Sequence, residues 1–125
     1  MFDHVEFPVG AIVASRDFFA AVLGELGLEE FFFDGEAGSA GYGTGDITGL
    51  LIFVGELGPR RLHICFSASS REQVAAAYVA GLKAGGRDNG GPGYREHYSP
   101  GYYAAFVLEP DGNNIEFLYR DPNVT

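Results

Sequence analysis

The chain has 125 residues, 46% of them hydrophobic and 14% aromatic, which suffices for one packed domain. Its formal net charge of -9 disfavours nucleic acid and anionic membrane surfaces as partners, because both would repel it. We find no long apolar run and no secretory leader pattern, so we expect a cytoplasmic protein without a membrane segment. The single cysteine, Cys65, excludes an intrachain disulfide, and we expect it to be a small buried hydrophobic residue. Small molecules and other proteins remain as possible partners.

The first half of the chain is predicted to form a strand, a helix and three further strands. The strand covers residues 2–9, and Ser15 is the expected N-cap of a helix that runs to about Leu26 and is ended by Gly27. Further strands are predicted at residues 29–34, 39–43 and 50–56, separated by turns rich in Gly and Asp.

The second half follows the same order. A strand is predicted at residues 61–67, and Ser69 with Glu72 forms a capping-box pattern for a helix that runs to about Lys83 and is ended by Gly85 and Gly86. Two more strands are predicted near residues 102–108 and 114–119. Residues 87–101 are rich in Gly and Pro, and we expect a partly mobile loop there that includes some strand.

The two halves form a weak internal repeat. A shift of 59 positions aligns residues 3–7 with residues 62–66, and it also pairs Phe19 with Tyr78. A shift of 64 aligns residues 51–54 with residues 115–118. The repeat predicts an α+β domain of two βαβββ modules, at about residues 1–58 and 59–121.

Three polar side chains are predicted to face away from the helix-packed side of their strands. In "EPDGNNIE" the Pro-Asp-Gly turn starts a strand in which alternation separates Glu116 from Ile115 and Phe117. His4 and His63 occupy equivalent places in the two first strands. Two imidazoles and a carboxylate suit a divalent metal such as Zn, Ni, Fe or Mn with open coordination positions. The alternative is that the histidines are half-exposed polar residues on an open sheet face.

The quoted segments carry a resemblance over essentially the whole chain. "DHVEFPV", "ASRDFFAAVLGELGL" and "EPDGNNIE" resemble the opening strand, helix and closing signature of the vicinal oxygen chelate superfamily. That superfamily includes glyoxalase I, bleomycin-resistance proteins, methylmalonyl-CoA epimerase and extradiol dioxygenases. The resemblance implies modules whose sheets curl into a cup, usually in a homodimer. It also implies that His4, His63 and Glu116 match three metal-binding positions.

The superfamily's fourth metal-binding position falls at about Ile52, within one or two residues. Isoleucine binds no metal, which disfavours glutathione-dependent glyoxalase activity, because that activity uses a metal-bound carboxylate as its base. The remaining ligands are closer to the two-histidine, one-carboxylate set of the dioxygenases. Candidate substrate contacts are His97, Tyr98, Tyr102 and Tyr103.

Two further side chains share the predicted faces of the histidines. Glu6 and Cys65 would both line the cup, and Glu6 is either a proton-abstracting carboxylate or a solvated one. His97 is either a general acid or base or a solvated loop residue. With Glu116, these are the candidate catalytic residues.

Two functions are compatible with these patterns. One is a metal-dependent lyase, isomerase or dioxygenase acting on a small oxygen-chelating substrate, and the other is a metal-free binding protein of the bleomycin-resistance type. The acidic surface favours a neutral or cationic ligand, although Arg60, Arg61 and Arg95 can counter this locally.

Overall fold

The computed structural model describes residues 2–125. The first half forms β1 (Val5–Val9), α1 (Ile12–Glu25), β2 (Glu29–Asp34), β3 (Ser39–Thr44) and β4 (Ile47–Val54). The second half forms β5 (His63–Ser67), α2 (Arg71–Lys83), β6 (Arg87–Asp88), β7 (Gly93–Tyr94), β8 (Tyr102–Leu108) and β9 (Asn114–Arg120).

The strands form two mixed sheets. The first has the order β1-β4-β3-β2, and the second has the order β5-β9-β8-β6, with β7 also paired to β8. In each sheet the first strand of the half lies at one edge and runs parallel to the last strand, whereas the other pairs are antiparallel. The predicted α+β class is confirmed, and the sheets are curled without closing into a barrel.

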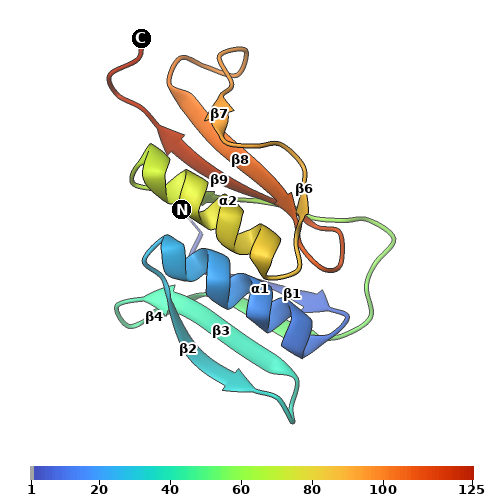
Figure 1. The fold of residues 1–125 in the computed structure, drawn as a ribbon. Coiled ribbons are helices and arrows are strands. Elements are labelled where there is room, and N and C mark those ends of the chain that lie inside the picture. The colour runs from blue at the N-terminus through green and yellow to red at the C-terminus, as the bar shows by residue number, and fades with distance from the viewer. Residues whose placement is uncertain (1) are drawn as a thin grey trace.

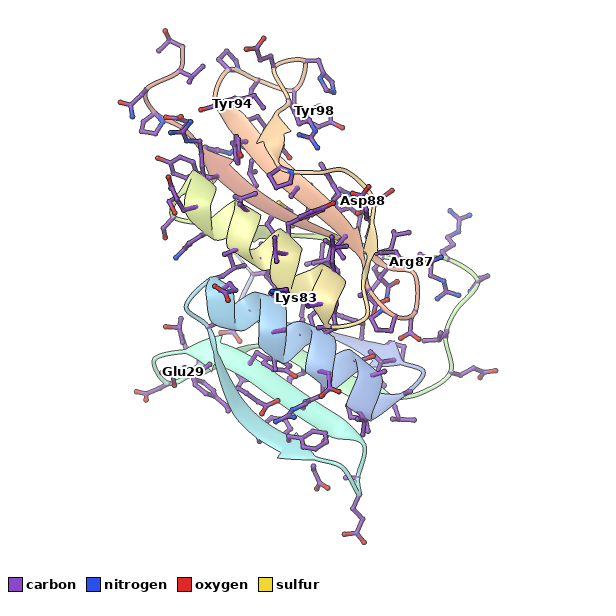
Figure 2. The ribbon with its side chains drawn as sticks, viewed as in Figure 1. Glu29, Lys83, Arg87, Asp88, Tyr94 and Tyr98 are labelled. Atoms are coloured by element: carbon purple, nitrogen blue, oxygen red, sulfur yellow. The ribbon has the colours of Figure 1, made fainter. Side chains whose placement is uncertain are left out.

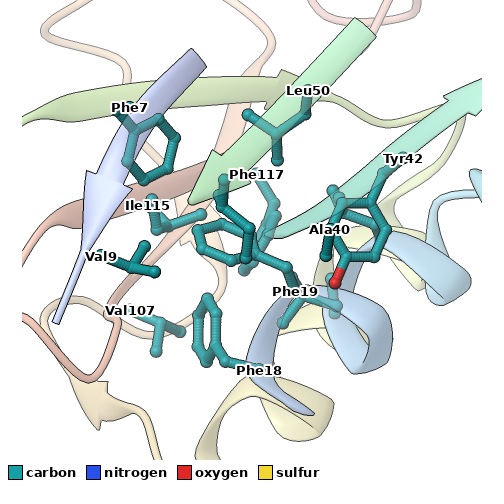
Figure 3. Close-up of a cluster of buried hydrophobic side chains, with 14 of the residues drawn as sticks. Phe7, Val9, Phe18, Phe19, Ala40, Tyr42, Leu50, Val107, Ile115 and Phe117 are labelled. Atoms are coloured by element: carbon teal, nitrogen blue, oxygen red, sulfur yellow. The ribbon is translucent and has the colours of Figure 1, made fainter. Parts of the chain in front are cut away.

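The two helices lie side by side, with α1 packed on the first sheet and α2 on the second (Figure 1). A Cβ atom at Gly81 of α2 would lie 3.1 Å from Val22 of α1, so glycine permits this close approach. Around the helices, fully buried side chains from both halves form one hydrophobic cluster that includes Phe18, Phe19 and Phe117 (Figure 3). The cluster packs against one face of each sheet. We call the opposite face, which points away from the helices, the open face.

Both predicted helix caps need correction. Ser15 lies within α1, where its backbone N–H bonds to the carbonyl of Ala11, the actual N-cap residue. The cap of α2 is Ser70 and not Ser69, because Ser70 Oγ accepts from the backbone of Gln73 at 3.1 Å. The Gln73 side chain in turn accepts from the Ser69 N–H at 2.7 Å, so Gln73 takes the place predicted for Glu72.

The offset between equivalent residues in the last strands of the two halves also differs by one from the predicted value. Val5 pairs with Leu50 in the first sheet, and the equivalent Ile64 pairs with Ile115 in the second. Leu50 therefore corresponds to Ile115, a shift of 65 and not 64. Both residues are buried toward the helices, which confirms the correction.

Two other features bear on the predicted elements. The strand expected within residues 87–101 is present as β6 and β7. No helix in residues 2–125 is long and apolar enough to cross a bilayer.

Candidate functional site

Glu116 lies on the face of the second sheet that points away from the helices. Its neighbours Ile115 and Phe117 are fully buried in the core, so alternation turns Glu116 to the opposite face, as predicted. It is nevertheless only 2% exposed, because side chains from the adjacent strands cover it. A buried carboxylate needs partners, and the strand register supplies them.

The two carboxylate oxygens of Glu116 have separate partners. Oε1 lies 2.9 Å from Nε2 of His63, which comes from β5. Oε2 accepts a hydrogen bond from the Tyr102 hydroxyl at 2.5 Å, from β8. Burial and this hydrogen bond raise the pKa of Tyr102, so the phenol remains protonated as the donor. The carboxylate is held from both sides.

Cys65 borders the same carboxylate. It is the direct strand partner of Glu116, and its residue surface is exposed, which contradicts the expectation of a buried residue. Alternation on β5 explains this, since Cys65 shares the open face with His63. Desolvation by surrounding groups and the Glu116 charge raise the pKa of Cys65 to about 12, so the thiol is protonated at neutral pH.

Aromatic rings surround the carboxylate on the open face. Phe106 is the strand partner of Glu116 on β8, and its ring centre lies 6.2 Å from that of His63. Tyr98 packs edge-on against Tyr102 at 5.1 Å, and His97 lies 4.3 Å from Tyr98. Figure 2 shows Tyr98 in the loop at the end of the second sheet. A row of rings thus connects His97 at the surface to Tyr102 and Glu116.

His4 makes no contact with His63 or Glu116 among the hydrogen bonds and ion pairs within residues 2–125, although its neighbours Asp3 and Val5 line the same cavity as Cys65. It immediately precedes β1 of the first sheet, is exposed, and pairs through Nδ1 with Asp3 at 2.7 Å. This hydrogen bond raises the pKa of His4. Within residues 2–125 of one chain, no three His, Cys, Asp or Glu side chains are grouped to hold a metal ion. The structure brings His63 and Glu116 together without His4.

The His63 and Glu116 pair nevertheless fits as two ligands of one divalent ion. Two ligand atoms at about 2.1 Å from a metal and at right angles to each other are about 3 Å apart, close to the 2.9 Å between Nε2 and Oε1. The bond from Tyr102 to Oε2 leaves Oε1 as the ligand oxygen, an arrangement common for metal-bound carboxylates. The chain thus provides part of a ligand set on rigid strands.

The fourth metal-binding position corresponds to Leu51 in the strand register. Glu116 pairs with Cys65, and the equivalent pair in the first sheet is Leu51 with Glu6. Ile52 points into the core at 1% exposure, so it occupies the wrong face for a ligand. Leu51 lies within the range predicted around Ile52, and leucine also has no atom that binds a metal.

Glu6 and Cys65 line different cavities. Glu6 is exposed in a cavity of about 330 Å³ formed with Arg60, Arg61 and other residues of the β4–β5 connection. Cys65 lines a largely apolar cavity of about 430 Å³ beside the β3–β4 hairpin, together with Tyr42 and Leu50. Neither of these cavities includes both candidate residues.

The sequence did not identify Phe106 or Arg120 as part of this surface. Both lie on the open face, and Arg120 covers the Tyr102 ring at 5.3 Å. Alternation along residues 102–108 would have placed Phe106 on the same face as Tyr102. Alternation along β9 would likewise have placed Arg120 on the face of Glu116. The contacts of Phe106 with Glu116 and of Arg120 with Tyr102, however, depend on the pairing of β8 with β9, which local patterns do not determine.

Two helix-covered mixed sheets, with a histidine and a buried glutamate paired on an open face, define a class of small α+β proteins built from repeated βαβββ units. The chain belongs to the Glyoxalase/Bleomycin resistance protein/Dioxygenase superfamily, whose family model matches residues 1–117. This confirms the resemblance seen in the sequence.

Solved structures agree with this membership. A glyoxalase/bleomycin resistance protein from Albidiferax ferrireducens T118 is 29% identical, with a TM-score of 0.80 and coverage of 96% of this chain and 99% of that one. A glyoxalase-related enzyme from Fulvimarina pelagi is 17% identical, with a TM-score of 0.72 and coverage of 100% and 96%. Lactoylglutathione lyase from Agrobacterium tumefaciens is 16% identical, with a TM-score of 0.68 and coverage of 95% and 92%. The latter two support the fold alone. A search of curated proteins gives no significant match.

Proposed function

We propose that the protein is a metal-dependent lyase, isomerase or dioxygenase that acts on a small oxygen-chelating substrate. The observation that carries this proposal is the pairing of His63 with a nearly fully buried Glu116 at 2.9 Å. A carboxylate held from both sides on a rigid sheet is preorganised as a metal ligand. A bound divalent ion, such as Zn, Ni, Fe or Mn, would polarise substrate oxygens and stabilise an oxyanion.

The remaining ligand would come from a second copy of the chain. β1 and β5 are the edge strands of their sheets, and each has one unpaired side. Within one chain, Val5 of β1 and Cys65 of β5 already line one cavity, so we propose that two protomers associate through their open faces and not through these edges. This association would bring the partner's His4 toward His63 and Glu116. The proposed homodimer therefore completes the site.

The chain's own residues would orient and protonate the substrate. Tyr102 fixes the Glu116 carboxylate, and His97 is proposed as a general acid or base at the rim because its ring contacts connect it to Tyr102. Glu6 remains a second candidate base, because β1 would border the shared site in the dimer. We also propose a cytoplasmic location, since a single cysteine suits a reducing compartment.

Metal analysis of purified protein tests the proposal. The wild type should hold close to one divalent ion per chain, and His63→Ala and Glu116→Gln should each lose most of it. The matched control is His97→Ala, which removes an exposed imidazole from the loop and should leave the metal content unchanged. A wild type that remains metal-free after incubation with each of the four ions would overturn the proposal.

A metal-free binding protein is the second candidate function. It is favoured by the fact that both Glu116 oxygens already have partners within the chain, so the carboxylate does not require an ion. In that case His63→Ala would leave small-molecule binding unchanged and the protein would contain no metal. The same metal analysis therefore separates the two functions.

A further inference from the structure

Two aromatic rings that neighbour Glu116 are each covered by an arginine. Cζ of Arg95 is 5.4 Å from the Phe106 ring centre, and Cζ of Arg120 is 5.3 Å from the Tyr102 ring centre. Phe106 is the strand partner of Glu116, and Tyr102 donates a hydrogen bond to it. The open face therefore has two positively charged groups over the rings that neighbour its buried carboxylate.

Arg95 is held in place by the glycine-rich loop. Its Nη1 donates to the carbonyl of Gly93 at 2.9 Å, and its Nη2 donates to the carbonyl of Gly91 at 2.8 Å. Its backbone N–H bonds to the carbonyl of Tyr102 at 2.7 Å. A Cβ atom at Gly90 would lie 3.1 Å from Phe106 and 3.2 Å from Arg95, so the loop fits closely around the guanidinium. The side chain is preorganised before any ligand binds.

Neither arginine has a carboxylate partner among the residues that the structure describes. Within residues 2–125, the ion pairs involve His4, Arg16 and His63 but not Arg95 or Arg120. Most Lys and Arg side chains of the chain share this property, since only Arg16 has a carboxylate partner within residues 2–125. Arg95 differs from the others in the loop carbonyls that hold its guanidinium. Arg95 uses two of its five N–H donors on loop carbonyls and retains the others. A guanidinium with free donors binds a carboxylate more strongly than a neutral group.

We propose that this open face binds a small planar carboxylate. Arg95 takes the carboxylate group, and the exposed ring of Tyr98 contacts the planar part of the ligand. The inference deepens the proposed function and rests on it for the position of the reacting oxygens, which would lie at His63 and Glu116. It also replaces the expectation of a neutral or cationic ligand, because the local charge is opposite in sign to the net charge of the chain.

Two probes that differ only in a carboxylate test the inference. 3,4-Dihydroxybenzoate and catechol share vicinal hydroxyls, and their affinities are measured by calorimetry on metal-loaded and on EDTA-treated protein. The wild type should bind the carboxylate about 10- to 100-fold more tightly in both forms, as expected for a charge-assisted hydrogen bond. Arg95→Gln should reduce this ratio to near one without weakening catechol binding.

Two further variants serve as controls. Arg60→Gln removes an exposed arginine from the β4–β5 connection and should keep the full ratio. Arg95→Lys keeps the charge but lacks the paired N–H donors of the guanidinium, and its ratio of the two affinities should be intermediate. Thermal melts establish that each variant is folded.

The outcomes separate this inference from the proposed metal site. The protein could bind no metal and still prefer 3,4-dihydroxybenzoate to catechol in a way that depends on Arg95. That result supports the inference and overturns only the proposed metal site. Metal binding through His63 with a ratio near one, or with a ratio unchanged in Arg95→Gln, overturns the inference alone. An equal loss in Arg60→Gln, or no measurable binding of either probe at millimolar concentration, also overturns it.

Discussion

The hydroxyl of Tyr102 donates a hydrogen bond to Oε2 of Glu116 at 2.5 Å, on the side of the carboxylate opposite His63. Because Glu116 is buried, this bond replaces contacts with water that the carboxylate would otherwise make. Tyr102 therefore fixes the direction of the carboxylate and leaves Oε1 toward His63.

Removing this hydroxyl should destabilise the protein. Tyr102→Phe keeps the ring but leaves Oε2 of a buried carboxylate without its donor, which should lower the free energy of unfolding by about 1–3 kcal/mol. Urea denaturation measures the change. The matched control is Tyr98→Phe, whose ring is 59% exposed and which should change stability by less than about 0.5 kcal/mol. Equal stability of Tyr102→Phe and wild type would show that water replaces the hydroxyl.

The close packing at the end of α2 gives a second prediction. A Cβ atom at Gly86 would lie 2.5 Å from Val107 and 2.7 Å from the carbonyl oxygen of Gly81. Gly86→Ala should therefore lower the free energy of unfolding by about 1–3 kcal/mol, since an overpacked core must shift. Gly58→Ala, where a Cβ atom meets nothing within 4 Å, is the control and should be close to neutral. If the two alanine variants unfold at the same urea concentration, the packing described here is incorrect.

Glu109 gives a prediction about pH. It is 1% exposed, its Oε1 accepts from the backbone of Asp111 and Asn113, and its Oε2 has no hydrogen-bond partner within residues 2–125. Burial raises the pKa of Glu109 above its ordinary value of 4.5. A carboxyl whose pKa is raised by folding stabilises the native state below the ordinary pKa. That contribution is lost as the pH rises through the folded value.

Comparison of wild type with Glu109→Gln isolates this contribution. The free energy of unfolding of the wild type minus that of the variant should fall between pH 4 and pH 8, because only the wild type ionises at this position. Denaturation across that range measures the difference. A difference that is constant or that rises with pH would contradict the assignment.

The sequence predicted the features that depend on local patterns. The Pro-Asp-Gly turn and the alternation of β9 were enough to place Glu116 on the open face, and the repeat placed His63 on the same side of β5. Strands β2 and β8 were predicted with their observed bounds, residues 29–34 and 102–108.

The errors came from features that depend on register or on neighbouring hydrogen bonds. Adjacent serines at positions 69 and 70 both fit a cap, and only the bond to Gln73 identifies Ser70. The shift between the last strands is 65 because that register puts Leu50 and Ile52 toward the helices. The bond from Tyr102 to Glu116 follows from the pairing of β8 with β9, which joins residues 14 positions apart.

The proposed metal site requires two chains, with His63 and Glu116 from one and the partner's His4 from the other. His4→Ala and His63→Ala should each abolish metal binding when produced alone. Co-production of the two variants should restore about a quarter of the wild-type metal content, because half of the dimers are mixed and one of their two sites keeps all its ligands. Mixed dimers, isolated with two different affinity tags, should hold one ion each. Metal-free mixed dimers from two variants that each lose metal would contradict a site shared between chains.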